Sequence, residues 1–209
     1  MPALTRRLGM YGGGFDPPHN AHVALARAAI AQLRLDQLLV VPTGDAYHKP
    51  RTLSCGAARQ AMCRLAFADL PAVTVSDIEL TRSGSSYTVD TLAVLRRSEP
   101  GARWFLLMGA DQAQRFHRWH RWAEILQQAT VAIAVRPDRA GGAPAWHAAD
   151  PLPGTDAPPS AVRILQFPAM DCSASVIRAR AAAGLPIDSC VPAAVARYID
   201  AHHLYRSET

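Results

Sequence analysis

Residues 8 to 22 read Leu8-Gly9-Met10-Tyr11-Gly12-Gly13-Gly14-Phe15-Asp16-Pro17-Pro18-His19-Asn20-Ala21-His22. A short apolar run here passes through three glycines and leads into residues 23–30, which have helical composition and spacing. Glycines at such a turn let the backbone approach a ligand, and the free N–H groups at a helix N-terminus suit phosphate. The segment predicts a strand, a tight glycine turn and a helix that together hold an anionic ligand.

Two histidines follow the glycine turn. His19 and His22 lie three residues apart, so they share one helix face if the first turn of the helix reaches back to them. Imidazole at that place can donate to phosphate oxygens and, when protonated, partly neutralise them. The glycines alone would equally fit an ordinary α/β turn with two surface histidines, so the interpretation depends on the remaining motifs.

Apolar runs recur along the chain with the length of strands that are buried on both faces of a parallel sheet. They cover residues 37–42, 103–108, 130–135 and 162–167, with a shorter run at 73–75 and a candidate edge extension at 77–80. Helices are expected at 54–69 with Ser54 as N-cap, from 85–92 onward, across 112–128, from Ser173 to Gly184 and from Pro192 to Leu204. The predicted fold class is α/β, a Rossmann-like doubly wound parallel sheet with right-handed crossovers.

One domain is the default for residues 1–209, because about half of the chain is hydrophobic and can bury a single core. Residues 138–160 shift to Gly, Pro, Ala and Asp without helical or strand period, which predicts a long loop, either a lid or a surface insertion. A C-terminal helical part is expected at 173–205.

Residues that could bind a ligand or take part in catalysis follow several predicted strands, where doubly wound sheets bind ligands. Gly109 would let adenine or ribose approach closely, and Asp111 either accepts from ribose hydroxyls or caps the next helix. Lys49 is the single lysine of the chain. It lies in the polar loop beyond residues 37–42 and is either a mobile cation for a triphosphate or a solvated side chain.

A second candidate phosphate site lies near the C-terminus. Ser173 can cap the helix that follows it, and Ser175 and Arg178 are three residues apart on one helix face. Two hydroxyls, free N–H groups and a guanidinium suit phosphate. The sequence therefore predicts two phosphate cradles, from opposite ends of the chain, at the carboxyl edge of one sheet.

These motifs resemble those of the nucleotidylyltransferase superfamily. The pattern G-G-x-F-D-P-x-H-x-x-H at 12–22 is similar to its H-x-G-H box, with Ala21 in place of glycine. The segment at 172–178 is similar to its I-S-S-T-x-I-R box, with Cys172 and Ala174 as departures. Both phosphate cradles thus match superfamily motifs, in the superfamily's order.

Other segments resemble one family within it, the bacterial nicotinate-mononucleotide adenylyltransferases. The loop at 47–50 is similar to its P-P-H-K loop, with Tyr47 in place of a proline, and 86–92 is similar to its S-Y-T-x-x-T-L motif. Trp119 and Trp122 match its paired tryptophans, of which the first stacks on the pyridine ring. At 136–138 this chain departs from the family's R-P-G turn, because Asp138 replaces the glycine.

The resemblance implies adenylyl transfer from ATP to nicotinate mononucleotide, which gives deamido-NAD and pyrophosphate in NAD biosynthesis. It implies catalytic roles for His19, His22 and Arg178, without a covalent intermediate. ATP contacts are implied at Gly13, Gly14, Phe15, Lys49, Gly109, Asp111, Arg136, Ser173 and Ser175. Nicotinate mononucleotide contacts are implied at Tyr87, Thr88 and Trp119. Mg²⁺ is expected to be carried mainly by the ATP phosphates, with no metal site on the protein.

The composition sets further limits. The net charge is +5, but the basic residues are scattered, so small anionic substrates explain it as well as nucleic acid does. The four cysteines form no C-x-x-C pair, and neither a membrane span nor a signal peptide stands out, which predicts reduced thiols and a cytoplasmic protein. A related adenylyltransferase, a non-catalytic nucleotide sensor and a nucleic-acid-binding module remain as alternatives. The choice between monomer and homo-oligomer stays open.

Overall fold

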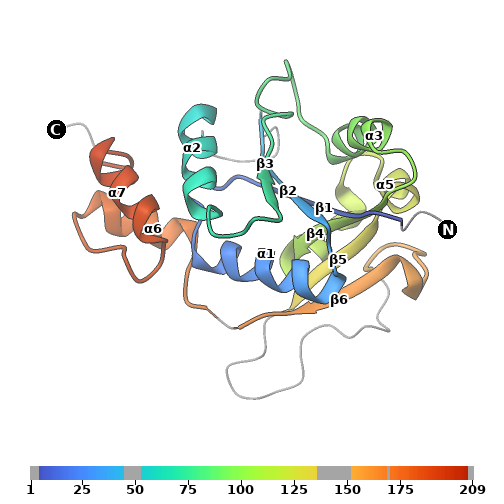
Figure 1. Cartoon of the computed structure of the whole chain (residues 1–209). Coiled ribbons are helices and arrows are strands. Elements are labelled where there is room, and N and C mark those ends of the chain that lie inside the picture. Colours follow the sequence, from blue (N-terminus) through green and yellow to red (C-terminus); the bar gives the residue numbers. More distant parts are fainter. Residues whose placement is uncertain (1–4, 45–52, 136–151, 169, 207–209) are drawn as a thin grey trace.

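The computed structural model describes residues 5–44, 53–135, 152–168 and 170–206, and its core is one six-stranded sheet (Figure 1). All strand pairs are parallel, and the order across the sheet is β3-β2-β1-β4-β5-β6. The strands are β1 (Arg7–Gly13), β2 (Gln37–Pro42), β3 (Val73–Val75), β4 (Arg103–Gly109), β5 (Thr130–Val135) and β6 (Val162–Gln166). The predicted doubly wound α/β fold is confirmed.

Helices cover both faces of the sheet, which is why its central strands are largely apolar. One face packs on α1 (Asn20–Leu33) and α2 (Gly56–Ala66), and α6 (Ala174–Ala182) and α7 (Ala193–Ala201) contribute to the same core cluster. The other face packs on α3 (Thr88–Ser98), α4 (Ala110–Ala113) and α5 (Trp122–Gln128). Successive residues of a strand point to opposite faces, so Met10 joins the second core cluster and Tyr11 joins the first.

Three local predictions are wrong. The N-cap of α2 is Cys55 rather than Ser54, whose backbone N–H instead donates to Asp16 Oδ2 at 3.1 Å. Residues 77–80 form a turn rather than an edge strand, and the Thr81 N–H closes it on the Asp77 carbonyl at 3.0 Å. Ser54 thus binds a residue distant in sequence, and residues 77–80 close on a local hydrogen bond. The apolar pattern indicates neither contact.

The single helix expected at 112–128 is the third wrong prediction. The chain forms α4, then a 3₁₀ turn at Phe116–Arg118, and then α5 from Trp122. Trp119 is extended, and Arg121 takes the left-handed conformation with φ 51°. The Arg121 guanidinium binds the Glu124 carboxylate, with Nε to Oε1 at 2.6 Å, in the first turn of the new helix.

The two segments expected outside the sheet are described in part. Residues 136–151 lie outside the described ranges, while Leu152 is fully buried and Pro159–Ala161 form a 3₁₀ turn. The C-terminal part contains α6 and α7, and α7 packs beside α2 (Figure 1). Gly184 follows α6 with φ 68°, and α7 ends at Ala201, before the expected limit at Leu204.

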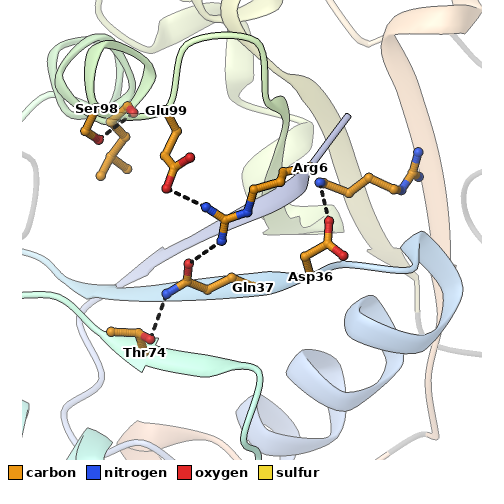
Figure 2. A network of polar contacts seen from close by, with 8 residues as sticks. Arg6, Asp36, Gln37, Thr74, Ser98 and Glu99 are labelled. Carbon is orange, nitrogen blue, oxygen red and sulfur yellow. Dashed lines mark hydrogen bonds and ion pairs between the residues drawn. The ribbon is translucent and has the colours of Figure 1, made fainter. Parts of the chain in front are cut away.

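A polar network ties the amino ends of the strands together (Figure 2). Arg6 binds Glu99 through Nη1 and Oε1 at 2.6 Å and donates to Gln37 Oε1 at 3.3 Å. Gln37 in turn donates to Thr74 Oγ1 at 2.9 Å. The network is exposed and links the β1, β2 and β3 ends of the sheet with the end of α3. Within the described ranges, no helix has the length and apolarity needed to cross a membrane.

Candidate active site

The carboxyl ends of β1 and β4 open onto a cavity of about 960 Å³. The two strands are neighbours, yet the chain leaves β1 for α1 on one face and leaves β4 for α4 on the other. Such a divergence creates the crevice in which doubly wound sheets bind ligands. The cavity wall includes residues 12–14 and His22, and also Tyr87, Thr88 and Trp119. Predicted site residues from four parts of the chain therefore share one cavity.

His19 and His22 form a stacked pair at the start of α1. The helix begins at Asn20 with His19 as an extended N-cap, so the first turn does reach back to both histidines. Their ring centroids lie 3.7 Å apart with 27° between the planes. The His19 backbone N–H donates to His22 Nδ1 at 3.1 Å, which leaves Nε2 as the N–H donor of a neutral His22. His22 lines the cavity, and Ala21 beside it does so as well.

The glycine segment differs from the predicted turn, because Gly12 and Gly13 are the last residues of β1. Both still line the cavity with Gly14. A Cβ atom on Gly13 would lie 3.0 Å from ring atoms of Phe15. Phe15 itself is 2% exposed and adopts φ 44°, and its ring centroid lies 5.0 Å from that of His22 in an edge-to-face arrangement. Phe15 thus supports His22 from the core and is absent from the described cavity wall.

Gly109 and Asp111 both line the cavity at the end of β4. Gly109 is the N-cap of α4, so the alternative in which Asp111 caps that helix is wrong. A Cβ on Gly109 would lie 2.7 Å from Asp111 Oδ1, because the carboxylate folds back over the glycine. The exposed Asp111 carboxylate is therefore held at the cavity mouth beside a backbone that a ligand can approach.

The second predicted cradle lies next to the histidine turn. Ser173 caps α6 by accepting from the Val176 N–H at 3.3 Å, and its hydroxyl oxygen lies 3.1 Å from that of Ser175. Arg178 Nη1 donates to the Asp16 carbonyl at 2.7 Å. The structure thus brings the two motifs together, although Ser173, Ser175 and Arg178 lie beside the cavity rather than in its described wall.

An aromatic cluster forms another part of the cavity wall. Tyr87 is the N-cap of α3, and its ring centroid lies 4.2 Å from that of His120. Trp119 lines the cavity, while Trp122 packs against the buried Phe116 with centroids 6.3 Å apart. Trp119 also contacts Phe116, with centroids 5.6 Å apart, but of the two tryptophans it is the one that lines the cavity.

Further residues of the cavity wall were missed by sequence reasoning. They include Glu79, Ser86, Arg115, Arg118 and His120. The continuous helix expected at 112–128 concealed three of them, since that prediction gave no reason for these side chains to meet a cavity. For Glu79, burial in an otherwise solvated loop is a tertiary effect without a local signal.

Glu79 is the electrostatically perturbed group of this wall. It is 5% exposed, and its Oε1 accepts from Thr91 Oγ1 at 2.9 Å. Burial raises the pKa of the Glu79 carboxyl, while the Thr91 and Gly44 hydrogen bonds and the Arg82 charge oppose the rise only in part. The nearby Ser86 hydroxyl is buried and has no hydrogen-bond partner in the described part of the chain. The wall therefore offers polar groups that a ligand can satisfy.

Two predicted ATP contacts, Lys49 and Arg136, lie outside the described residues. Across the ranges that the structure describes, no group of three His, Cys, Asp or Glu side chains could hold a metal ion. The expectation that Mg²⁺ arrives mainly on the phosphates therefore stays a prediction. So do the individual roles of the site residues.

Comparison with known proteins adds a sequence match over most of the chain. The cytidylyltransferase-like family matches residues 10–180. A protein of Albidiferax ferrireducens named "probable nicotinate-nucleotide adenylyltransferase" is 50% identical over 202 residues, which are 97% of this chain and 99% of that protein. A Methylibium petroleiphilum protein of the same name is 39% identical over 209 residues and covers 96% and 92% of the two chains.

Solved structures share the fold at low sequence identity. The nicotinic acid mononucleotide adenylyltransferase of Plasmodium falciparum complexed with NaAD superimposes with a TM-score of 0.75 at 18% identity, covering 96% of this chain and 97% of that chain. The same enzyme complexed with APC gives a TM-score of 0.71 at 16% identity, with the same coverage. These likenesses agree with the six-stranded parallel architecture.

Proposed function

Since this chain belongs to the nicotinate-nucleotide adenylyltransferases, within the cytidylyltransferase-like family, we propose that it transfers an adenylyl group from ATP to nicotinate mononucleotide. The products are deamido-NAD and pyrophosphate. We place this step of NAD biosynthesis in the cytoplasm, where the four free cysteines would stay reduced. The rest of this subsection derives how the described residues would perform it.

The observation that carries the proposal is the shared cavity. One wall holds glycine backbone and His22, which suit phosphate, and another holds Tyr87 and Trp119, which suit a flat ring. At about 960 Å³ the cavity stands near the upper end of ligand pockets, as two nucleotide-sized substrates need. A site for a single nucleotide would not require both walls.

The reaction we propose is a direct displacement. A 5′-phosphate oxygen of the mononucleotide attacks the α-phosphorus of ATP, the bond to the bridging oxygen breaks, and pyrophosphate leaves with that electron pair. Such transfers depend on positioning and charge stabilisation rather than on a covalent enzyme intermediate. His22 Nε2 would donate to the phosphate oxygens as negative charge moves toward the leaving group, with His19 fixing its orientation.

Arg178 would hold the outer phosphates of ATP from the other side of the histidine turn. Its Nη1 is bound to the Asp16 carbonyl, and a guanidinium carries five N–H donors. This guanidinium, with the Ser175 hydroxyl, would supply the charge-assisted hydrogen bonds that phosphate prefers. Mg²⁺ would neutralise the phosphates. Asp111 offers an exposed carboxylate at the cavity, and carboxylate oxygens are ligands that Mg²⁺ prefers.

Recognition of nicotinate would fall to the start of α3 and to Trp119. The free N–H groups at a helix N-terminus favour a carboxylate, and Tyr87 and Thr88 begin this helix on the cavity wall. The Trp119 indole would stack on the pyridine ring, whose positive charge suits an aromatic face. This division gives the acid an advantage over the amide at one end of the substrate.

The test is pyrophosphate release with ATP and Mg²⁺, run in parallel with nicotinate mononucleotide and nicotinamide mononucleotide. We expect strong release with the acid and weak release with the amide. Release with the amide alone would reverse the assignment of the α3 end. Release with neither substrate would overturn the proposed substrate and direct the search to other phosphate-bearing acceptors.

A further inference from the structure

Asp16 is a buried carboxylate at which distant parts of the chain meet. It is 3% exposed. Its Oδ1 accepts from the Tyr205 hydroxyl at 2.6 Å, and its Oδ2 accepts from the Ser54 backbone N–H at 3.1 Å. Its backbone carbonyl accepts from Arg178, as described above. The tyrosine follows Asp16 by 189 positions, so this contact ties the last turn of the described chain to the histidine turn.

A buried arginine also binds the backbone that leads into the histidine turn. Arg59 on α2 is 3% exposed, and its Nη1 donates to the Gly14 carbonyl at 3.1 Å. Its Nε donates to the Ser54 carbonyl at 2.8 Å, and Ser54 is the residue that donates to Asp16. Burial lowers the pKa of the Arg59 guanidinium, and the Asp16 charge opposes the fall. Asp16 and Arg59 thus stabilise each other's charge while both bind the turn.

The tyrosine is fitted to this carboxylate. Burial, together with the hydrogen bond and charge of Asp16, raises the pKa of Tyr205, so its hydroxyl stays a donor. Tyr205 adopts φ 67°, a left-handed conformation that is unfavourable for a residue with a side chain. The hydrogen bond to Asp16 is made in that conformation.

The link from Asp16 to the histidines is short and stiff. Pro17 and Pro18, whose rings restrict φ, are all that separates Asp16 from His19. The backbone N–H of Asn20 donates to the Cys190 carbonyl at 2.9 Å, so the C-terminal part also holds the first turn of α1. A shift of Asp16 is therefore passed to the stacked rings rather than absorbed in a loop.

We propose that Tyr205, acting through Asp16, is a positioning residue that holds the His19–His22 pair in its working geometry. The proposal rests on the proposed function only for its kinetic consequence. A misplacement of about 1 Å in a phosphoryl-transfer site costs rate rather than binding, because the charge-stabilising donors no longer meet the transition state. The C-terminal turn would in this way contribute to turnover without touching a substrate.

The experiment compares Tyr205→Phe with Tyr198→Phe, which removes a hydroxyl from the neighbouring α7 and leaves Asp16 untouched. We expect Tyr205→Phe to lower kcat about tenfold with both KM values within about twofold, and Tyr198→Phe to change neither. If the wild type is active and Tyr205→Phe has the same kcat, the inference is overturned and the proposed function is not. An inactive wild type would instead overturn the proposed function.

Two readouts separate positioning from simple stability. In a His22→Ala background the Tyr205→Phe effect on kcat should vanish, since the residue acts through the histidines; a persisting tenfold loss would contradict the proposal. Independently of any substrate, the side-chain NMR signals of His19 and His22 should move in Tyr205→Phe and not in Tyr198→Phe. Signals that stay in place would overturn the proposal even if turnover could not be measured.

Discussion

The rings of His19 and His22 stack 3.7 Å apart while the backbone of the first donates to the second. The N-cap of α1, His19, is thereby tied directly to His22, which lines the cavity. Phe15 packs edge-to-face with His22 from the core, so the imidazole is oriented before any substrate arrives. Preorganised donors of this kind stabilise developing charge without reorganisation at the moment of reaction.

The first prediction concerns the cavity-facing histidine. His22→Ala should lower kcat by about 10²-fold to 10³-fold, because a donor to the shifting phosphate charge is lost. The KM for ATP should change by no more than about threefold, because ground-state binding depends on the whole cradle. Steady-state kinetics checks the split, and equal losses in both constants would contradict the assigned role.

The two tryptophans make a matched pair for the second prediction. Trp119→Ala should raise the KM for nicotinate mononucleotide roughly tenfold, since aromatic stacking on a base is worth about 1–3 kcal/mol. Trp122→Ala should lower the melting temperature, because its ring packs on buried Phe116, and should leave that KM unchanged. A larger KM effect at Trp122 would place the pyridine ring elsewhere.

A third prediction follows from the space around two glycines, Gly44 and Gly12. In Gly44→Ala the new Cβ would stand 2.1 Å from the Glu79 carbonyl oxygen, a backbone atom that cannot move aside. We expect a loss of about 1–3 kcal/mol in the free energy of unfolding. Gly12→Ala is the control, because its Cβ finds Met10 Cε at an ordinary 3.9 Å. Denaturant titration without ligands compares them, and similar stabilities would contradict the geometry.

The fourth prediction is a pH dependence of stability that comes from Glu79. Its pKa is raised in the folded protein, so this contribution is fully present below the ordinary value of 4.5 and is lost as pH rises through the folded pKa. The melting temperature of Glu79→Gln minus that of the wild type should therefore increase as pH rises from 4 to 8. Glu99→Gln, on the exposed amino edge, is the control. A difference in melting temperature that stays constant over this pH range would mean that the pKa of Glu79 is not raised.

The central strands were predictable because they are short, largely apolar runs followed by a glycine or a polar loop. The run at 37–42 matches β2, and 103–108 falls one residue short of β4. The broken segment at 112–128 was not predictable, since residues 119–121 make ring contacts outside a helix, Trp119 with Phe116 and His120 with the distant Tyr87. Such contacts override the local helical pattern.

The candidate site divides in the same way. The histidines, the glycines and the serine–arginine motif are local patterns, and the structure sets both motifs around one turn. Asp16 also stood in the first motif, but nothing near it in sequence indicates Tyr205 or Arg59 as its neighbours. Glu79 was likewise hidden, because its burial depends on a loop that packs against α3. Long-range polar contacts leave no periodic signal in a single chain.

The exposed network of Arg6, Gln37 and Thr74 lies at the end of the sheet opposite the cavity (Figure 2). Strand β1 has 7 residues between the two ends, which at about 3.3 Å per residue is roughly 20 Å. An electrode, bead or sensor chip coupled near Thr74 would therefore leave the cavity mouth open to solution. Immobilised in that orientation, the protein would keep its cavity accessible to substrates in a flowing solution.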